Sequence, residues 1–456
     1  MNEGVTLTSG AVWTGPDTWH EAGAAVEGVA PAAVLLLGAG RPRGLWSDER
    51  GWSAWFGEAA VLTASGRDRF AAIRAGAAAA VGPHGGRFFG GFAFHDAGDS
   101  VPRWEGFPAA RFVLPEVEVR GGPGGAAVTV RVPAGHDAGA RLREVTAALR
   151  RATAAANGAP GATDGSAPRR PDGARSGAAS AASALAEPHD GWNANVAAAL
   201  AEIAAGRLEK VVLARALDLP SDERGAVNVA LRLCRDEPDA HTFYFEPVAG
   251  RAFLGAAPES IAEVDGGVLR TTAVAGSAPR GAAPEEDSAL ADALLASAKD
   301  RAEQALVVRD IAQRLAGLVE DLEVDRGPHL VRFASIQHLE TVLSGRLRDG
   351  VDALAVLEAL HPTPAVGGAP RAEALAFLRR AEGFRRGWYA GPVGWFEPGG
   401  DAGFAPGLRS ALHSREDGWR LFAGAGIVEG SEPEKEWAET AVKLEPVLAA
   451  LRRARG

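Results

Sequence analysis

Short apolar runs separated by glycine and proline fill the first 150 residues and predict a β-rich region. The runs are too short for typical helices and are rich in valine, leucine and phenylalanine, which favours strands. Strands are expected at 32–37, 87–94, 109–114, 117–120 and 126–132, and a helix at 67–74. We interpret the aromatic stretch 104–108 as core packing rather than a binding element.

The second half of the chain alternates between helical and extended patterns. Residues 192–206 place apolar side chains at helical spacing and end at Gly206, and the apolar run 210–215 that follows predicts a strand. A helix is also expected at 227–235. Four further runs predict an antiparallel meander, at 242–245, 252–255, 257–264 and 268–276.

Residues 289–322 are expected to be almost wholly helical. One apolar face is predicted, made of Ala305, Val308, Ala312, Leu315 and Val319. Because strands and helices are grouped rather than strictly alternating, the pattern favours an α+β fold.

The segment 153–187 consists almost entirely of Ala, Gly, Ser, Pro, Arg and Asp. Such a composition buries too little apolar surface to offset the entropy of ordering, so we expect a flexible linker. It divides the chain into a β-rich region, 1–152, that packs on a catalytic region, 188–456.

A glycine-broken apolar run near the C-terminus, 421–428, predicts a strand that leads into a helix. Ser431 and Glu434 have the spacing of a capping box at the helix start. The positions that follow place two carboxylates and an ammonium on one helix face, at Glu436, Glu439 and Lys443. A surface ion-pair stripe is the ordinary interpretation of such a triplet. Its position after a glycine-rich strand favours a ligand site instead.

Charge and cysteine content narrow the class of protein. The formal net charge of −10 argues against nucleic acid or an anionic membrane as a partner. No apolar run has the length of a transmembrane helix, and the N-terminus lacks the pattern of a signal peptide. The single cysteine, Cys234, excludes an internal disulfide and suits the reducing cytoplasm, where we expect the protein to act as a monomer.

Two acidic pairs with a spacing of three residues are candidate metal ligands: Asp300 with Glu303, and Glu436 with Glu439. Hard carboxylate oxygens in this number suit Mg²⁺, but spacing alone cannot bring the pairs together. Lys210 begins an apolar strand and Glu259 follows a proline, so either is an ordinary solvated charge unless both share a buried site. Taken alone, His338 is more typical of a hydrogen-bonded core histidine.

Eight blocks follow one another in a recognisable order along residues 190–446: 208–215, 253–260, 270–281, 299–303, 337–341, 360–368, 386–394 and 421–443. Together they resemble the chorismate-utilising enzymes, the family of anthranilate synthase component I, and within it most closely the isochorismate synthases. The looser N-terminal stretches 88–94 and 104–116 are similar to the menaquinone-pathway branch.

The resemblance implies a large two-sheet antiparallel β-sandwich flanked by helices, and a Mg²⁺-dependent, reversible conversion of chorismate to isochorismate. It makes Lys210 the base that activates water against C2 of chorismate, and Glu259 the acid that protonates the departing C4 hydroxyl. The implied metal residues are Glu303 and Glu439 as direct ligands, with Asp300 and Glu436 in support through water.

The resemblance also implies how the substrate is held. Lys443 and the metal would bind the ring carboxylate, and Arg409 with Tyr389 would bind the pyruvyl carboxylate. The other residues assigned to substrate binding are Gly276, Gly426, Thr363 and His338, the last with its task left open.

Two positions depart from patterns within the family. Ala275 stands where aminodeoxychorismate-forming relatives carry a nucleophilic lysine, and this favours water as the nucleophile. Gln304 stands where many relatives carry histidine. Three alternatives stay open: an isochorismate synthase of a siderophore pathway, a salicylate synthase that goes on to eliminate pyruvate, and a catalytically silent protein that binds chorismate.

Overall fold

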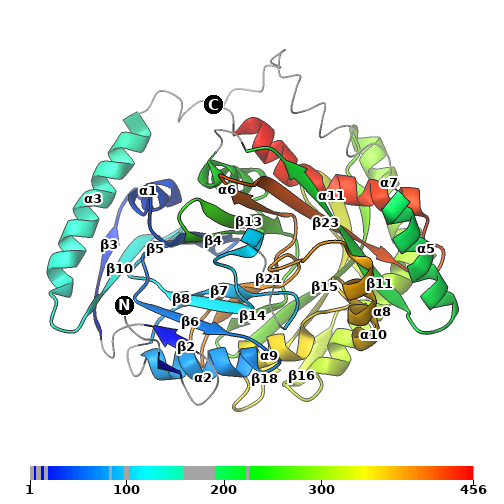
Figure 1. The fold of residues 1–456 in the computed structure, drawn as a ribbon, viewed down its shortest axis with the longest axis horizontal. Helices are drawn as coiled ribbons and strands as arrows, with labels where there is room; N and C mark the ends of the chain where they lie inside the picture. Colours follow the sequence, from blue (N-terminus) through cyan, green and yellow to red (C-terminus); the bar gives the residue numbers. More distant parts are fainter. Residues whose placement is uncertain are drawn as a thin grey trace.

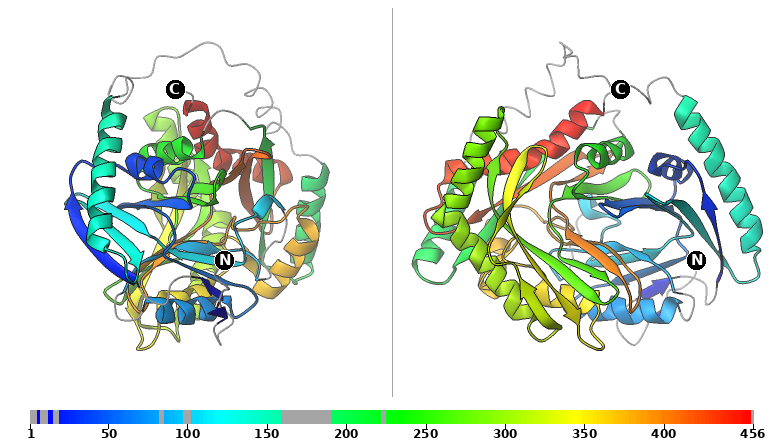
Figure 2. Two further views of the ribbon diagram at one scale, coloured as in Figure 1. Left: turned by 60° about the vertical axis from the view of Figure 1, so that its left-hand side comes forward. Right: turned by 180° about the vertical axis from the view of Figure 1, so that it is seen from behind.

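The computed structural model describes residues 5–6, 12–14, 19–81, 85–96, 102–158, 190–221 and 225–454, and its strands form two large antiparallel sheets. Figures 1 and 2 show the two sheets in the interior, with helices along their outer faces. The α+β sandwich expected for this chain is therefore confirmed.

The first sheet has twelve strands. Its order is β1 (Val5–Thr6), β2 (Val12–Thr14), β6 (Ala60–Ala64), β8 (Ala110–Leu114), β7 (Phe88–Phe92), β20 (Pro392–Phe396), β21 (Ala402–Pro406), β14 (Ala262–Asp265), β15 (Val268–Pro279), β18 (Ile336–Leu347) and β16 (Val319–Val324), with β17 (His329–Arg332) paired to β18.

The second sheet has eleven strands. Its order is β19 (Gly368–Ala369), β11 (Lys210–Leu219), β23 (Gly418–Ile427), β22 (Ser410–Ser414), β13 (Arg251–Ala257), β12 (His241–Val248), β4 (Arg43–Asp48), β5 (Gly51–Phe56), β9 (Val117–Gly122), β10 (Gly125–Pro133) and β3 (Trp19–Val26).

Helices bury the outer face of each sheet. The first sheet is covered by α2 (Arg69–Val81), α8 (Ala298–Leu315) and α9 (Ala353–Leu360). The second is covered by α1 (Pro31–Leu37), α3 (Ala138–Gly158), α6 (Ala226–Asp236) and α11 (Pro433–Arg453). The remaining helices are α5 (Asp190–Ala204) and α10 (Arg371–Ala381), which pack against β11, and α7 (Pro284–Ala296), which packs against β15. None of the helices in the described ranges is long and apolar enough to cross a membrane.

An aromatic core joins the two sheets. Trp55 of β5 stacks on Phe89 of β7 with 4.0 Å between ring centroids, so the contact links one sheet to the other. Trp104, in the short 3₁₀ helix Pro102–Trp104, is buried in the same core, as expected for the stretch 104–108. Such rings supply large apolar area in defined geometry and hold the sheets in a fixed relation.

The N-terminal region contributes strands to both sheets rather than forming a separate layer. Within the sheets, β4 pairs with β12, and β7 pairs with β20. Helix α3 continues to Gly158, so residues 153–158 of the expected linker are helical. Residues 159–187 of that linker lie outside the described residues.

The expected strand at 32–37 is wrong, because these residues form α1. Pro31 occupies the first turn, and Ala30 before it has the extended backbone of an N-cap residue. Proline is well suited to this position, since its fixed φ matches the helix and its missing N–H is not needed there. A buried apolar run of this length fits a strand or a helix equally well.

The long helix expected at 289–322 is also wrong in extent. It is broken at Ser297, whose side chain accepts a hydrogen bond from the Asp300 backbone N–H and so starts α8, and β16 begins at Val319. The buried face is correspondingly shifted from the expected one, to Gln304, Val307, Ile311 and Leu315.

Two further expectations need correction. The predicted meander is divided between the sheets, because β12 and β13 pair in the second sheet while β14 and β15 pair in the first. The capping box at Ser431 does not form: Glu432 is the N-cap residue of α11 without a side-chain cap, and the Ser431 hydroxyl accepts from the Val428 N–H.

Candidate active site

Side chains from both sheets and from helices α8 and α11 line one cavity. Its walls include β11 and β23 of the second sheet and β15 and β18 of the first, so the cavity lies between the two sheets. Ten of the thirteen residues that the sequence assigns to the site line it: Lys210, Glu259, Gly276, Glu303, His338, Tyr389, Arg409, Gly426, Glu439 and Lys443.

Lys210 is the first residue of β11 and only 1% exposed. Its ammonium lies 2.7 Å from the Glu303 carboxylate on α8. A β-carbon on Gly426 of the neighbouring β23 would lie 2.6 Å from Glu303 Oε1 and 3.0 Å from Lys210 Cε. A side chain at 426 would therefore displace the ends of Lys210 and Glu303 from the positions in which they form this ion pair.

Glu259 lies on the segment that crosses from β13 of the second sheet to β14 of the first, and its side chain is buried. Burial raises the pKa of Glu259 to about 7, although the positive charges of Lys210, Lys443 and Arg409 oppose the rise. This carboxyl group can therefore carry a proton near neutral pH, which an acid catalyst needs.

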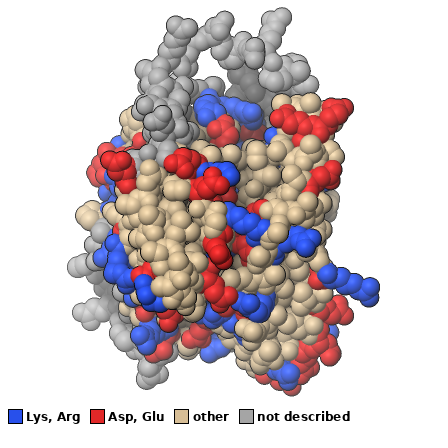
Figure 3. All heavy atoms as spheres, turned by 90° about the vertical axis from the view of Figure 1, so that its right-hand side faces the viewer, with Lys and Arg blue, Asp and Glu red and all other residues tan. Residues whose placement is uncertain are grey.

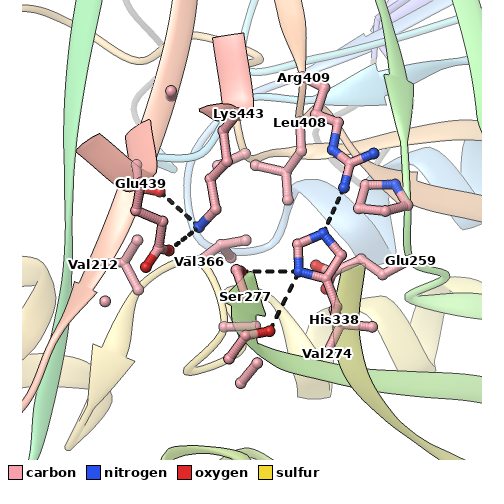
Figure 4. A pocket seen from close by; sticks show the side chains of 18 of the residues that line it. Val212, Glu259, Val274, Ser277, His338, Val366, Leu408, Arg409, Glu439 and Lys443 are labelled. Atoms are coloured by element: carbon pink, nitrogen blue, oxygen red, sulfur yellow. Dashed lines mark hydrogen bonds and ion pairs between the residues drawn. The ribbon is translucent and has the colours of Figure 1, made fainter. Parts of the chain in front are cut away.

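Arg409 and His338 form a hydrogen-bonded chain on the side of the cavity away from Glu439 (Figure 4). Arg409 Nη2 is 2.5 Å from His338 Nε2, and His338 Nδ1 is 2.9 Å from the Ser277 hydroxyl and 3.3 Å from the Gly276 carbonyl. Because arginine only donates, Nε2 accepts and the histidine proton resides on Nδ1. Burial, together with Arg409 and Lys443, holds the pKa of His338 well below its usual value, so the ring is neutral.

The other guanidinium nitrogen of Arg409, Nη1, is buried and has no hydrogen-bond partner among the described residues. Arg409 also has a φ of 44°, a conformation rare outside glycine. An unpaired buried donor on a strained backbone is the arrangement expected where an anionic ligand completes the site.

Helix α11 brings its acidic and basic side chains to the cavity as the spacing predicted. Lys443 lies 2.6 Å from Glu439 one turn away and donates to the Gly424 carbonyl at 3.0 Å. Glu436, one turn earlier, is 2.8 Å from Lys299 of α8. The pair Asp300 and Glu303 therefore lies near the start of α8, and the pair Glu436 and Glu439 near the start of α11, and these two helix ends are neighbours.

A family model described as chorismate binding enzyme matches residues 36–452, most of the chain. The chain belongs to this family.

Two curated relatives of the chorismate binding enzymes match over most of their length. The salicylate biosynthesis isochorismate synthase of Pseudomonas aeruginosa is 38% identical over 411 residues, which cover 88% of this chain and 83% of the relative. The isochorismate synthase MenF of Bacillus subtilis is 34% identical over 375 residues, which cover 82% of this chain and 75% of that relative.

Solved structures of the family share the fold. The menaquinone-specific isochorismate synthase MenF of Escherichia coli matches with a TM-score of 0.75 at 26% identity, over 96% of this chain and 95% of that one. Anthranilate synthase component I of Streptococcus pneumoniae has a TM-score of 0.64 at 20% identity, over 94% of this chain and 92% of that one.

Three residues assigned from the sequence do not line the cavity of this chorismate binding enzyme. Asp300 packs against Gly276: a β-carbon added at Gly276 would lie 3.0 Å from the Asp300 Cβ. Glu436 is buried in its pair with Lys299. Thr363 lies behind the wall, where its carbonyl accepts from the N–H groups of Val366 and Gly367.

The donor set fits a magnesium ion with few protein ligands. Glu303 and Glu439 are the carboxylates of α8 and α11 that face the cavity, and Mg²⁺ in such sites uses one or two carboxylates beside waters and substrate oxygens. Burial raises the pKa of Glu439, and the negative charges of Glu303 and Glu436 raise it further. A divalent cation would relieve this crowding of like charges. Within the described ranges, no group of three or more His, Cys, Asp or Glu side chains is placed to hold a metal ion together.

Some contributors to the site had no clear signal in the sequence. Ser277 reaches His338 because β15 and β18 place the two residues directly opposite each other, a register that no local pattern reveals. Ala390 on the cavity wall has a φ of 60°, and Lys299 pairs with Glu436 across two helices. Ser277 and Lys299 stand within blocks that carry the family resemblance, which was the available hint.

Proposed function

We propose that this chain is an isochorismate synthase, an isomerase that moves the hydroxyl group of chorismate from C4 to C2. The observation that supports this most strongly is one cavity in which a buried lysine and a carboxyl group with a pKa of about 7 face a common space. Water adds at C2 while the C4 hydroxyl leaves as water, so the reaction has no net change in atoms and runs in both directions.

Lys210 acts as the base in this proposal. In its neutral form Nζ takes a proton from the attacking water, and its position at the start of β11 beside Gly426 fixes the nitrogen on the cavity wall. The ion pair with Glu303 orients the same nitrogen before substrate arrives. Ala275 supports water as the nucleophile, since no lysine is present there to attack C2.

Glu259 acts as the acid and gives its proton to the departing C4 hydroxyl. Its raised pKa supplies that proton near neutral pH, whereas an ordinary glutamate would already have lost it. Burial of Glu259 thus keeps a proton on the acid at a pH where an exposed glutamate is ionised.

The carboxylates of chorismate need cationic partners in this cavity. Arg409 offers its unpaired Nη1 to the pyruvyl carboxylate, with Tyr389 beside it, while Lys443 faces the ring carboxylate. His338 holds Arg409 from behind through its neutral Nε2. Bound Mg²⁺ would add fixed positive charge at the ring carboxylate, held by Glu303 and Glu439.

The test of the proposal is product analysis with chorismate and Mg²⁺, with a chelator as control. Lys210→Ala should abolish isochorismate formation while chorismate binding and the melting temperature stay close to those of the wild type. Lys210→Gln should behave likewise, although its amide can still donate to Glu303. Near-normal turnover in either variant would exclude Lys210 as the base.

The salicylate synthase alternative differs in its products. Stoichiometric pyruvate, measured with lactate dehydrogenase across several pH values, would favour it. Tight chorismate binding without any product would instead favour the catalytically silent binding protein. The presence of both Lys210 and Glu259 in one cavity argues against that alternative.

We further propose that the product feeds menaquinone synthesis from the cytoplasm. The N-terminal stretches 88–94 and 104–116 support this, as does the likeness to MenF over 96% of the chain. The name of the Pseudomonas relative points to salicylate instead. Deleting the gene and measuring menaquinone and salicylate in the same cells would separate the two destinations.

A further inference from the structure

Three lysines each form one close ion pair with one of the carboxylates Glu303, Glu436 and Glu439 on α8 and α11. Lys210 pairs with Glu303 at 2.7 Å, and Lys443 pairs with Glu439 at 2.6 Å. Both of these lysines line the cavity. The third pair joins Lys299 to Glu436 at 2.8 Å and lies outside the cavity lining, so this lysine has no place in the proposed chemistry.

The third pair is asymmetric in exposure. The Lys299 side chain is 39% exposed, whereas that of Glu436 is 3% exposed. Lys299 is the one ion-pair partner recorded for Glu436 among the described residues. A buried carboxylate is costly without a counter-charge, so whichever cation stands beside it contributes strongly to its free energy.

The charge of Lys299 also reaches the two carboxylates that face the cavity. Lys299 is four residues before Glu303 on α8, and its partner Glu436 is three residues before Glu439 on α11, so this ion pair lies one helical turn from both cavity carboxylates. Lys299 therefore stands in the field of the same carboxylates that fit a divalent cation. Figure 3 shows Lys, Arg, Asp and Glu side chains intermixed on the face that lies on the right-hand side of Figure 1, where α5, α7 and α8 are found.

We propose that Lys299 is a built-in counter-ion that competes with the divalent cation for the carboxylates of α8 and α11, and thereby sets the affinity for that cation. This inference rests on the proposed function, because it assumes the Mg²⁺ site at Glu303 and Glu439. A cation that enters there is repelled by the ammonium at Glu436. Without Lys299, Glu436 would be an uncompensated buried charge that attracts the cation more strongly.

A purely structural role for Lys299 makes the opposite prediction. If the pair with Glu436 mainly holds the first turn of α8 against the first turn of α11, then its loss should spread the carboxylates and weaken cation binding. The sign of the change in affinity therefore distinguishes competition from positioning.

The experiment is a calorimetric titration of the full chain with Mg²⁺ or Mn²⁺ in the absence of chorismate. Lys299→Gln should lower the dissociation constant by about threefold to tenfold, the range expected for removing one nearby, partly screened charge. Lys299→Arg keeps the charge and should bind like the wild type. Lys435→Gln is the matched control: it removes the same charge from α11, where Lys435 is 73% exposed and paired with Glu432. It should leave the constant nearly unchanged.

The outcomes separate this inference from the proposal beneath it. If the wild type binds no divalent cation, both the proposed metal site and this inference are wrong. Binding by the wild type with an unchanged or higher dissociation constant for Lys299→Gln would overturn the inference alone. Equal tightening by Lys435→Gln would also overturn it, because general surface charge would then explain the effect.

Discussion

Glu259 and Glu303 line the same cavity, yet their pKa values move in opposite directions. Burial raises the pKa of both groups, but Lys210 forms a hydrogen-bonded ion pair with Glu303 and, with Lys443 and Lys299, brings its pKa below the usual value. Glu259 has only the longer-range attraction of Lys210, Lys443 and Arg409, which leaves its pKa at about 7. One direct partner thus decides which carboxyl group keeps its proton.

This difference predicts a pH dependence for the reaction. Glu259 must be protonated to act as the acid, so the slope of log kcat/KM against pH should decrease by about one at about pH 7, as Glu259 loses its proton. Glu259→Gln should lose at least about 100-fold in kcat at every pH.

A second variant checks that the break belongs to Glu259. The negative charge of Glu340 raises the pKa of Glu259, so Glu340→Gln should move the break to lower pH. A profile whose slope does not change between pH 5.5 and 9, or a break that Glu340→Gln leaves in place, would contradict the assignment. Initial rates measured from pH 5.5 to 9 suffice for both.

At the scale of elements, the site depends on two neighbouring strands, β11 and β23. Their antiparallel register places Gly426 opposite Val212, two residues beyond Lys210 on the same face. The missing side chain at 426 leaves room for Lys210 and Glu303 to meet above the sheet. Strand β23 therefore contributes to the site through the space that is left where Gly426 has no side chain.

Gly426→Ala should accordingly damage catalysis more than folding. The new methyl group would force the Lys210 and Glu303 side chains apart, and a displacement of about 1 Å can cost about 100-fold in kcat/KM. Both side-chain ends can shift, so the free energy of unfolding should fall by only about 1–3 kcal/mol.

Gly124→Ala is the control for this variant, because nothing lies within 4 Å of the added carbon. It should keep wild-type activity. Steady-state kinetics and denaturant unfolding on both variants make the comparison, and full activity in Gly426→Ala would show that the glycine is not needed for the ion pair.

The elements that the sequence predicted well are those with a strong local pattern. Lys210 at the start of β11, the glycine-broken β23 and the common face of Glu436, Glu439 and Lys443 all follow from spacing. The errors arose where the local pattern is ambiguous or tertiary structure decides. The six residues 32–37 are apolar throughout, so a helix and a strand fit equally well.

The assembly of the site was not accessible from local pattern. No spacing rule brings α8 beside α11, or places Ser277 opposite His338. The order of the family blocks supplied the residue set, and the fold supplied the contacts. The division of the expected meander between two sheets, which puts Glu259 on the crossing, required the tertiary structure as well.

At the scale of the whole molecule, the two halves of the chain share both sheets. Strand β4 covers the edge of β12, and β7 covers the edge of β20. Helices α1 and α3 complete the core over the second sheet. The β-rich region 1–152 is therefore part of the fold on which the cavity is built.

We predict that residues 188–456 do not fold alone, although they carry every residue assigned to the site. Removing the N-terminal region exposes the long apolar strand β12 and the buried strand β20 as open edges, which favours aggregation. Soluble yield and a thermal melt test this. Supplying residues 1–158 as a separate polypeptide should restore soluble protein, whereas a cooperative melt of 188–456 by itself would contradict the prediction.

The two walls of the cavity belong to different sheets, and this has a consequence for how the sequence can evolve. Lys210 is carried by one sheet, His338 by the other, and Glu259 by the segment between them. The aromatic core that includes Trp55 and Phe89 therefore helps to align the base, the acid and the anion site, besides stabilising the fold. Substitutions in that distant core can be neutral for stability and still be removed by selection, because they alter a distance inside the cavity.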